Sequence, residues 1–196
     1  MNQYNIKINK KKHGKIRITG GFLKNSIIRI HRNSIIRPTT SFIREKLFNW
    51  LNSYIKHANC LDCFAGSGVL GIESISRYAQ SVTFIDNNKK VILDLNNNVK
   101  KINILNHVKI VHNNILRWLK QNNCIYQIVF IDPPFNHQII NKTVNYLEKY
   151  NCLTSNSFIY IEKKNDLLLI DIPKKWILYK STKTKNIACY LYVKQY

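Results

Sequence analysis

The chain has 196 residues, of which 31 are Lys or Arg and 10 are Asp or Glu, giving a formal net charge of +21. That length suits one domain with a small appendage and excludes a large multidomain enzyme. With 45% apolar residues, the composition excludes an intrinsically disordered chain and supplies enough apolar side chains for a core.

The positive charge is concentrated near the N-terminus. Residues 1–59 hold thirteen Lys or Arg and one acid, Glu45, a net charge of +12. Residues 1–14 are polar, rich in lysine and without periodicity, so they are interpreted as a basic tail. A composition rich in Asn, Ile and Lys is typical of an AT-rich genome, and this codon bias accounts for part of the lysine excess. It does not explain why the excess is concentrated in one segment. The sequence therefore predicts a surface here that binds a polyanion.

A small hairpin is predicted next. Two short β-type runs, residues 15–19 and 27–30, are separated by a Gly-Gly pair, and such a pattern is typical of two strands joined by a turn. We place the tail and this hairpin together as an extension, residues 1–36, ahead of a main domain at 37–196.

An amphipathic helix opens the main domain. Thr39 and Thr40 are both suited to cap a helix, and apolar residues then recur at helical spacing. The recurring residues are Ile43, Leu47, Leu51 and Ile55, with Phe48, Trp50 and Tyr54 beside them. The sequence thus predicts one helix with a single buried face.

From Cys60 onward, strand-like runs alternate with helical segments, which favours a parallel sheet covered on both faces. These runs are residues 60–64, 82–86, 108–111, 125–132 and 158–162. Two further β runs, 176–181 and 187–193, are separated by a polar turn without a helix, so they predict an antiparallel hairpin. The expected fold is α/β and Rossmann-like, with a mostly parallel seven-stranded sheet that ends in this hairpin.

Membrane and metal chemistry are not expected. No apolar run approaches the ~20 residues that span a bilayer, and the basic start lacks the apolar segment of a secretory signal, so we expect a cytoplasmic protein. Its odd set of cysteines should be reduced and mostly buried. They are Cys60, Cys63, Cys124, Cys152 and Cys189. Cys60 and Cys63 have C-x-x-C spacing, but no second pair or nearby His completes a zinc site.

Glycines cluster after the first strand of the main domain. Gly66, Gly68 and Gly71 satisfy G-x-G-x-x-G, and Asp86 ends the next strand about 20 residues on, as a ribose-binding acid does. This pattern fits NAD as well as S-adenosylmethionine, and a tight turn without a ligand is a further alternative. Asp62, four residues before the first glycine, suits the cationic amine of a methionyl group better than a pyrophosphate.

Two adjacent prolines follow the fourth parallel strand, in Asp132-Pro133-Pro134-Phe135. Consecutive prolines fix φ and remove N–H donors, so the strand must stop there and a rigid ledge begins. Asp132 and the Pro133 carbonyl can accept hydrogen bonds from an exocyclic amine, while Phe135 can stack on a nucleobase. A strand-ending turn with a buried Phe is the alternative interpretation.

These motifs together resemble the RsmD-like bacterial 16S rRNA (guanine(966)-N(2))-methyltransferases, class I enzymes that use S-adenosylmethionine. The segments that carry the resemblance are 17–21 (RITGG), 37–40 (RPTT), 44–51 (REKLFNWL), 61–68 (LDCFAGSG), 76–77 (SR) and 129–135 (VFIDPPF). The resemblance implies that the cofactor contacts are Asp62, Ala65, Gly66, Ser67, Gly68, Asp86 and Asn114. It also implies that Asp132, Pro133, Pro134 and Phe135 hold the target amine.

The same resemblance implies that the partner is 16S rRNA within the small ribosomal subunit. We expect the protein to be a monomer. The cations expected to hold rRNA phosphates are Arg17, Lys24, Arg29, Arg32, Arg37 and Arg44. Three alternatives stay open: a DNA adenine-N6 methyltransferase, a non-catalytic ribosome-assembly factor and an NAD-dependent dehydrogenase. The dehydrogenase alternative explains neither the proline ledge nor the basic segment.

Overall fold

The computed structural model describes most of the chain. The described ranges are residues 14–30, 39–134, 137–165 and 170–196. The basic tail up to residue 13, the expected phosphate contacts Arg32 and Arg37, and the expected stacking residue Phe135 lie outside these ranges.

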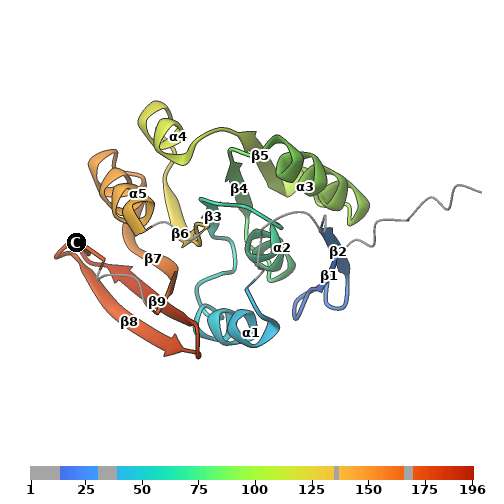
Figure 1. The fold of residues 1–196 in the computed structure, drawn as a ribbon, viewed down its shortest axis with the longest axis horizontal. Coiled ribbons are helices and arrows are strands. Elements are labelled where there is room, and N and C mark those ends of the chain that lie inside the picture. Colours follow the sequence, from blue (N-terminus) through green and yellow to red (C-terminus); the bar gives the residue numbers. More distant parts are fainter. Residues whose placement is uncertain (1–13, 31–38, 135–136, 166–169) are drawn as a thin grey trace, which may run out of the picture.

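A seven-stranded sheet forms the centre of the molecule (Figure 1). Its strands are β3 (Asn59–Asp62), β4 (Ser81–Asp86), β5 (Val108–His112), β6 (Tyr126–Ile131), β7 (Leu153–Lys164), β8 (Trp176–Lys183) and β9 (Ile187–Lys194). Their spatial order is β5-β4-β3-β6-β7-β9-β8. Strands β3 to β7 pair in parallel, and β9 is antiparallel to both β7 and β8. The expected parallel sheet with an antiparallel C-terminal hairpin is confirmed.

The strand order changes direction between β3 and β6. The chain runs outward from β3 through β4 to β5, then crosses back so that β6 pairs with the other side of β3. In open α/β sheets, ligands bind at the carboxyl ends of the strands at such a switch point. The fold therefore directs attention to the residues that follow β3 and β6.

Helices cover both faces of the sheet, as expected. Three of them, α1 (Ser41–Trp50), α2 (Val69–Ser76) and α3 (Lys89–Lys101), share one buried apolar cluster with the sheet, whereas α4 (Ile115–Gln121) and α5 (His137–Lys149) share the other. Residues in β6 alternate between the two clusters: Ile128 and Phe130 belong to the first, Val129 and Ile131 to the second. This double burial explains why the strand is a continuous apolar run.

The cysteines are free thiols in the described structure, and four of the five are buried. Cys60 and Cys63 belong to different apolar clusters on opposite faces of the sheet, so their C-x-x-C spacing does not bring the thiols together. Burial raises the pKa of Cys60 to about 12, which keeps this thiol protonated. The described residues contain no group of His, Cys, Asp and Glu that could hold a metal.

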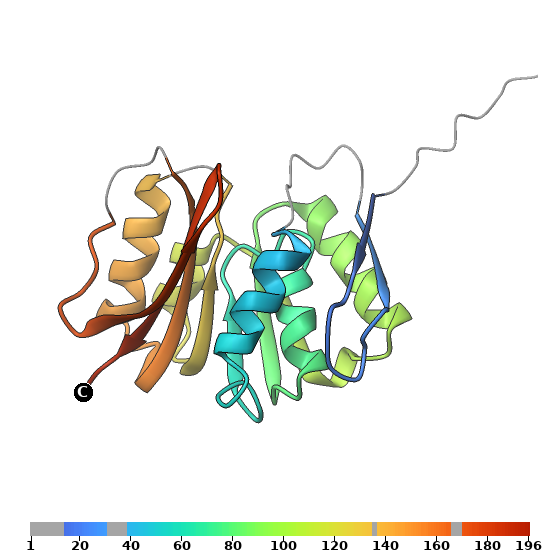
Figure 2. The same cartoon turned by 90° about the horizontal axis from the view of Figure 1, so that it is seen from below.

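The predicted N-terminal hairpin is present as β1 (Gly14–Arg17) and β2 (Ile27–Ile30), an antiparallel pair separate from the main sheet. Figure 2 shows it beside α3, at the end of the molecule opposite β8 and β9. Ile16 and Ile28 turn inward and are buried. The side chain of Asn98 on α3 bonds both the N–H and the carbonyl of Arg29, at 3.0 and 2.8 Å, and so fastens the hairpin to the domain.

Helix α1 begins as predicted but ends earlier. Thr40 is its N-cap and accepts a hydrogen bond from the N–H of Ile43. The α-helix stops at Trp50, and residues up to Ile55 continue as a turn in which the N–H of Ile55 donates to the Leu51 carbonyl at 2.9 Å. The recurring apolar residues Ile43, Leu47, Leu51 and Ile55 are buried, as is Phe48, whereas Trp50 is half-buried and Tyr54 is exposed. Within the described residues, no helix is long and apolar enough to cross a membrane.

Candidate active site

The glycine loop connects β3 to α2 at the switch point. Gly66 and Gly68 have φ of 51° and 74°, a left-handed conformation that side-chain-bearing residues adopt at a cost. The loop closes on itself because the N–H of Gly68 donates to the Ala65 carbonyl at 2.6 Å. The Ser67 hydroxyl accepts from the N–H of Val69 at 3.4 Å. The sequence pattern thus gives a tight turn directly before a helix.

The third glycine of the pattern serves packing. A Cβ atom at Gly71 would lie 2.2 Å from a ring carbon of Phe84 and 2.8 Å from a methyl of Val82. Contacts that short do not occur in proteins, so α2 can approach the sheet this closely because residue 71 has no side chain.

Asp86 lies against the glycine loop. One carboxylate oxygen accepts from the N–H of Gly66 at 3.0 Å and the other from the N–H of Asn88 at 2.8 Å. Each carboxylate oxygen has a second lone pair. The expected ribose contact and the expected loop contact are therefore adjacent, and Asp86 can accept further hydrogen bonds while it holds the loop.

Asp62 is 2% exposed. Burial raises the pKa of its carboxyl to about 7, the Asp86 charge adds to the rise, and the backbone groups of Gly71 and Phe64 oppose it. A buried acid with a raised pKa is stabilised in its charged form by a nearby cation. Asp62 is thus suited to an ammonium group, as the sequence predicted.

Asn114 is the N-cap of α4. Its side-chain oxygen accepts from the N–H groups of Leu116 and Arg117, and its own N–H donates to the Asn113 side chain at 2.8 Å. The side-chain oxygen of Asn114 is thus occupied by the helix cap, and the cofactor contact expected at this residue stays a prediction. The side-chain NH₂ group is the part that the described residues do not engage.

Asp132 follows β6 and lies beside the end of β3. The strands pair Asp62 with Phe130, and the N–H of Cys63 donates to the Phe130 carbonyl at 3.0 Å. Asp132 is half-buried as a residue, and its carboxylate accepts from the Thr39 hydroxyl at 3.2 Å. Burial raises its pKa well above the usual value, Glu162 and Asp62 add repulsion, and the bond from Thr39 opposes the rise. The next residue, Pro133, is buried and Pro134 is exposed.

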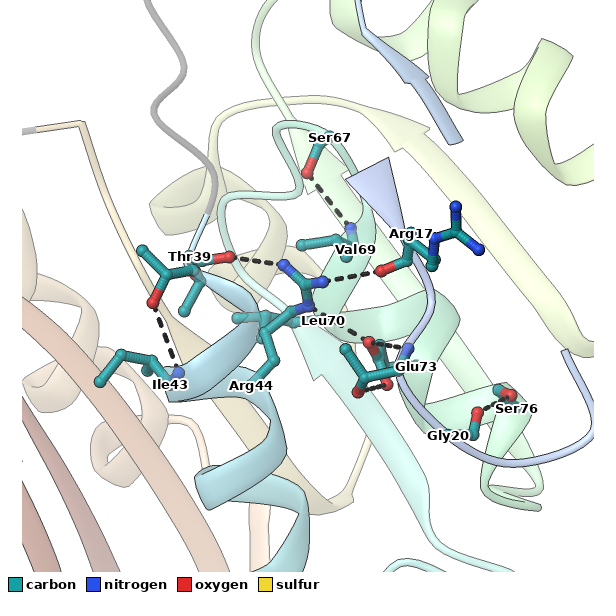
Figure 3. Close-up of polar contacts among 12 residues, drawn as sticks. Arg17, Gly20, Thr39, Ile43, Arg44, Ser67, Val69, Leu70, Glu73 and Ser76 are labelled. Carbon is teal, nitrogen blue, oxygen red and sulfur yellow. Dashed lines mark hydrogen bonds and ion pairs between the residues drawn. The ribbon is translucent and has the colours of Figure 1, made fainter. Parts of the chain in front are cut away.

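Arg44 is the expected phosphate contact that the structure corrects. It is 3% exposed, and its guanidinium donates to the carboxylate of Glu73 at 3.2 Å, to the Thr39 carbonyl at 2.6 Å and to the Arg17 carbonyl at 2.8 Å (Figure 3). A guanidinium so engaged inside the protein is not available to rRNA. Its partner Glu73 is fully buried in α2.

The outer face of the hairpin is basic. Arg17, Lys24 and Arg29 are all exposed, as a phosphate contact requires. Lys15 pairs with Arg29 across the two strands and is exposed too, although sequence reasoning did not select it. The alternation of the strand could have indicated Lys15. Side chains of a strand point alternately to its two faces, so Lys15 and Arg17 share the face opposite to the buried Ile16.

The sheet order and the antiparallel last pair of strands are those of the class I methyltransferase architecture, and the candidate site described above lies at the ends of β3 and β6. A solved structure described as a putative methyltransferase from Escherichia coli has this fold. It superposes with a TM-score of 0.85 at 35% identity, covering 93% of this chain and 99% of that one.

Comparison of sequences gives the family. The model of the family described as "Conserved hypothetical protein 95" matches residues 16–193. A protein of Buchnera aphidicola named ribosomal RNA small subunit methyltransferase D is 50% identical over 184 residues, 93% of this chain and 95% of its own length. Its namesake in Escherichia coli K12 is 37% identical over 182 residues, 93% and 91% of the two chains. The chain belongs to this family, the RsmD family of methyltransferases.

Proposed function

We propose that this enzyme transfers a methyl group from S-adenosylmethionine to the exocyclic N2 amine of one guanine in 16S rRNA, the base at position 966 by family resemblance. The names of the relatives support small-subunit rRNA as the substrate class. The observation that carries the proposal is the position of Asp132. Asp132 stands at the switch point, directly after β6, the strand next to the one that leads into the glycine loop.

The residues around the glycine loop fit S-adenosylmethionine by their chemistry. When bound, this cofactor supplies a methyl group on a sulfonium. Asp62 offers a buried carboxylate to the ammonium of the methionyl group, and Asp86 keeps lone pairs for ribose hydroxyls. The Asn114 NH₂ group is a donor for the adenine edge. Backbone around Gly66 and Gly68 allows close approach of a ligand.

Asp132 supplies what an aromatic amine needs. The lone pair of such an amine is delocalised into the ring, so catalysis depends on alignment of the reacting atoms at about 3 to 3.5 Å. The Asp132 carboxylate and the Pro133 carbonyl accept the two amine hydrogens and fix the direction of the nitrogen. As positive charge develops on nitrogen, the carboxylate stabilises it. Its raised pKa also makes Asp132 a stronger acceptor for the departing proton.

The hairpin supplies the binding surface for rRNA. Lys15, Arg17, Lys24 and Arg29 form an exposed basic group, and such cations hold phosphates without reading sequence. A guanine reaches Asp132 after it leaves its stack, as in other enzymes that modify a base. With rRNA as substrate, we place the enzyme in the cytoplasm.

Transfer of a labelled methyl group tests the proposal. Purified protein is incubated with labelled S-adenosylmethionine and either small ribosomal subunits that lack the modification or duplex DNA. We expect label in the RNA of the subunits and none in DNA. Label in duplex DNA alone would instead support a DNA adenine-N6 enzyme, and rRNA binding without any transfer would support an assembly factor.

A further inference from the structure

Thr39 contacts the carboxylate of Asp132 through its side-chain hydroxyl. It is 2% exposed, and its hydroxyl donates to one carboxylate oxygen, Oδ2, at 3.2 Å. Thr39 belongs to no helix or strand. It directly precedes Thr40, the N-cap of α1. Both Thr39 and Thr40 were suited to cap the helix, and the N-cap is Thr40.

Thr39 is held in place from its backbone side. Its carbonyl accepts from Arg44 at 2.6 Å, and Arg44 is fixed by the buried carboxylate of Glu73 and by the Arg17 carbonyl (Figure 3). Glu73 in turn accepts from the N–H and hydroxyl of Thr19, at 2.8 and 2.9 Å. A buried ion pair thus ties the hydroxyl of residue 39 to α2 and to the end of the basic hairpin.

The surroundings of Asp132 make this donor important. The neighbouring groups that titrate are Asp62 on β3, Tyr160 and Glu162 on β7, and Cys189 on β9. Asp62 and Glu162 repel the ionised carboxylate, whereas the Thr39 hydroxyl stabilises it. A carboxylate among other acids needs a fixed donor to keep one orientation and one charge state.

We propose that Thr39 is a positioning residue for methyl transfer: its hydroxyl fixes Oδ2 of Asp132 and leaves the other oxygen to accept from the target amine. This inference rests on the proposed function and deepens it. Arg44, which contacts Thr39 and the last residue of β1, connects the position of the rRNA-binding hairpin to that of the carboxylate.

Thr39→Val tests this role because it removes the hydroxyl and keeps the branched shape. The kcat on small subunits should fall about tenfold, because the loss of one hydrogen bond to a charged group has an effect of about this size. The KM and the cofactor affinity should stay within about twofold of the wild-type values. Loss of a donor to the carboxylate raises the pKa of Asp132. The acidic limb of the kcat profile, where activity needs the ionised form, should therefore move to higher pH by about one unit. Thr39→Ser, which retains the hydroxyl, should restore both.

Thr40→Val is the matched control. It removes a hydroxyl from the adjacent residue and weakens the cap of α1, so it should lower the melting temperature and leave kcat and the pH profile unchanged. Thr39→Ala must show the same pH shift as Thr39→Val, which excludes an effect of the added methyl. Two results would overturn this inference alone. In the first, the wild type is active and Thr39→Val has the same kcat and pH profile. In the second, Thr39→Ser is as impaired as Thr39→Val. A wild type without guanine methylation overturns the proposed function as well.

Discussion

Glu73→Gln removes the charge at the centre of the buried network while nearly preserving the shape of the side chain. In the native protein one oxygen of Glu73 accepts from the Thr19 N–H and from Arg44. The other accepts from the Thr19 hydroxyl and lies 3.6 Å from the Arg77 guanidinium. The carboxylate is fully buried, Arg44 is 3% exposed and Arg77 is 17% exposed.

The magnitude follows from what the variant leaves behind. A glutamine oxygen can still accept from the Thr19 N–H, and the hydroxyl can rotate toward the new NH₂ group, so these two bonds largely survive. Arg44 keeps its charge in the interior without a counter-charge, and breaking a buried pair in this way costs about 3 to 5 kcal/mol. Because Gln keeps the hydrogen bonds, we expect a loss near the lower end, about 3 kcal/mol, in the free energy of unfolding.

Urea unfolding followed by circular dichroism measures this loss, with the m-value checked for constancy. Glu45→Gln is the control, because it makes the same chemical change on the exposed surface of α1 and should shift stability by less than about 0.5 kcal/mol. If both substitutions changed the free energy of unfolding by the same small amount, the buried Arg44 charge would not need Glu73 as its counter-charge, and the reasoning would be refuted.

Three further outcomes follow from the site and its packing. Gly71→Ala forces a Cβ against Phe84 and should lower the free energy of unfolding in urea by about 1 to 3 kcal/mol; an unchanged midpoint would contradict the close packing. The pKa of Asp62 is raised to about 7, and a bound ammonium group lowers it, so binding of S-adenosylmethionine should release a proton. Calorimetry should show affinity rising with pH up to about 7. Asp62→Asn should bind weakly and without this rise, and a flat wild-type profile below pH 7 would exclude the assigned contact. The double change Lys15→Gln and Arg29→Gln should reduce the slope of log K against log salt for rRNA binding by about 1 to 2. Lys149 is an exposed lysine on α5, and Lys149→Gln should leave that slope unchanged. Equal slopes for both variants would show that the rRNA does not bind the hairpin.

The sheet could be predicted from the sequence because each strand carries its own signal. Buried runs such as Ile128–Ile131 are apolar at every position, since both faces of the sheet are covered. The glycine loop and the proline ledge were also visible locally. Glycines at 66 and 68 meet a conformational need at their own positions, and consecutive prolines end a strand whatever surrounds them.

Contacts between distant segments could not be predicted in the same way. Arg44 resembles a surface cation in its own helix, yet its partner Glu73 lies 29 residues away, and Thr39 lies 93 residues from Asp132. One signal was present: Glu73 is the single acid in an α2 sequence of apolar and small residues, and such an acid needs a buried cation. The role of the Asn114 oxygen as a helix cap was likewise hidden until the start of α4 was known.

The most direct test of the central claim is the nucleoside that gains the methyl group. Small subunits that lack the modification are treated with wild-type protein or with Asp132→Ala, and their rRNA is digested and analysed by mass spectrometry. We expect one N2-methylguanosine for each subunit with the wild type and none with Asp132→Ala, although the variant still binds S-adenosylmethionine. A methylated adenosine, or full methylation by Asp132→Ala, would contradict the claim that this carboxylate receives the guanine amine.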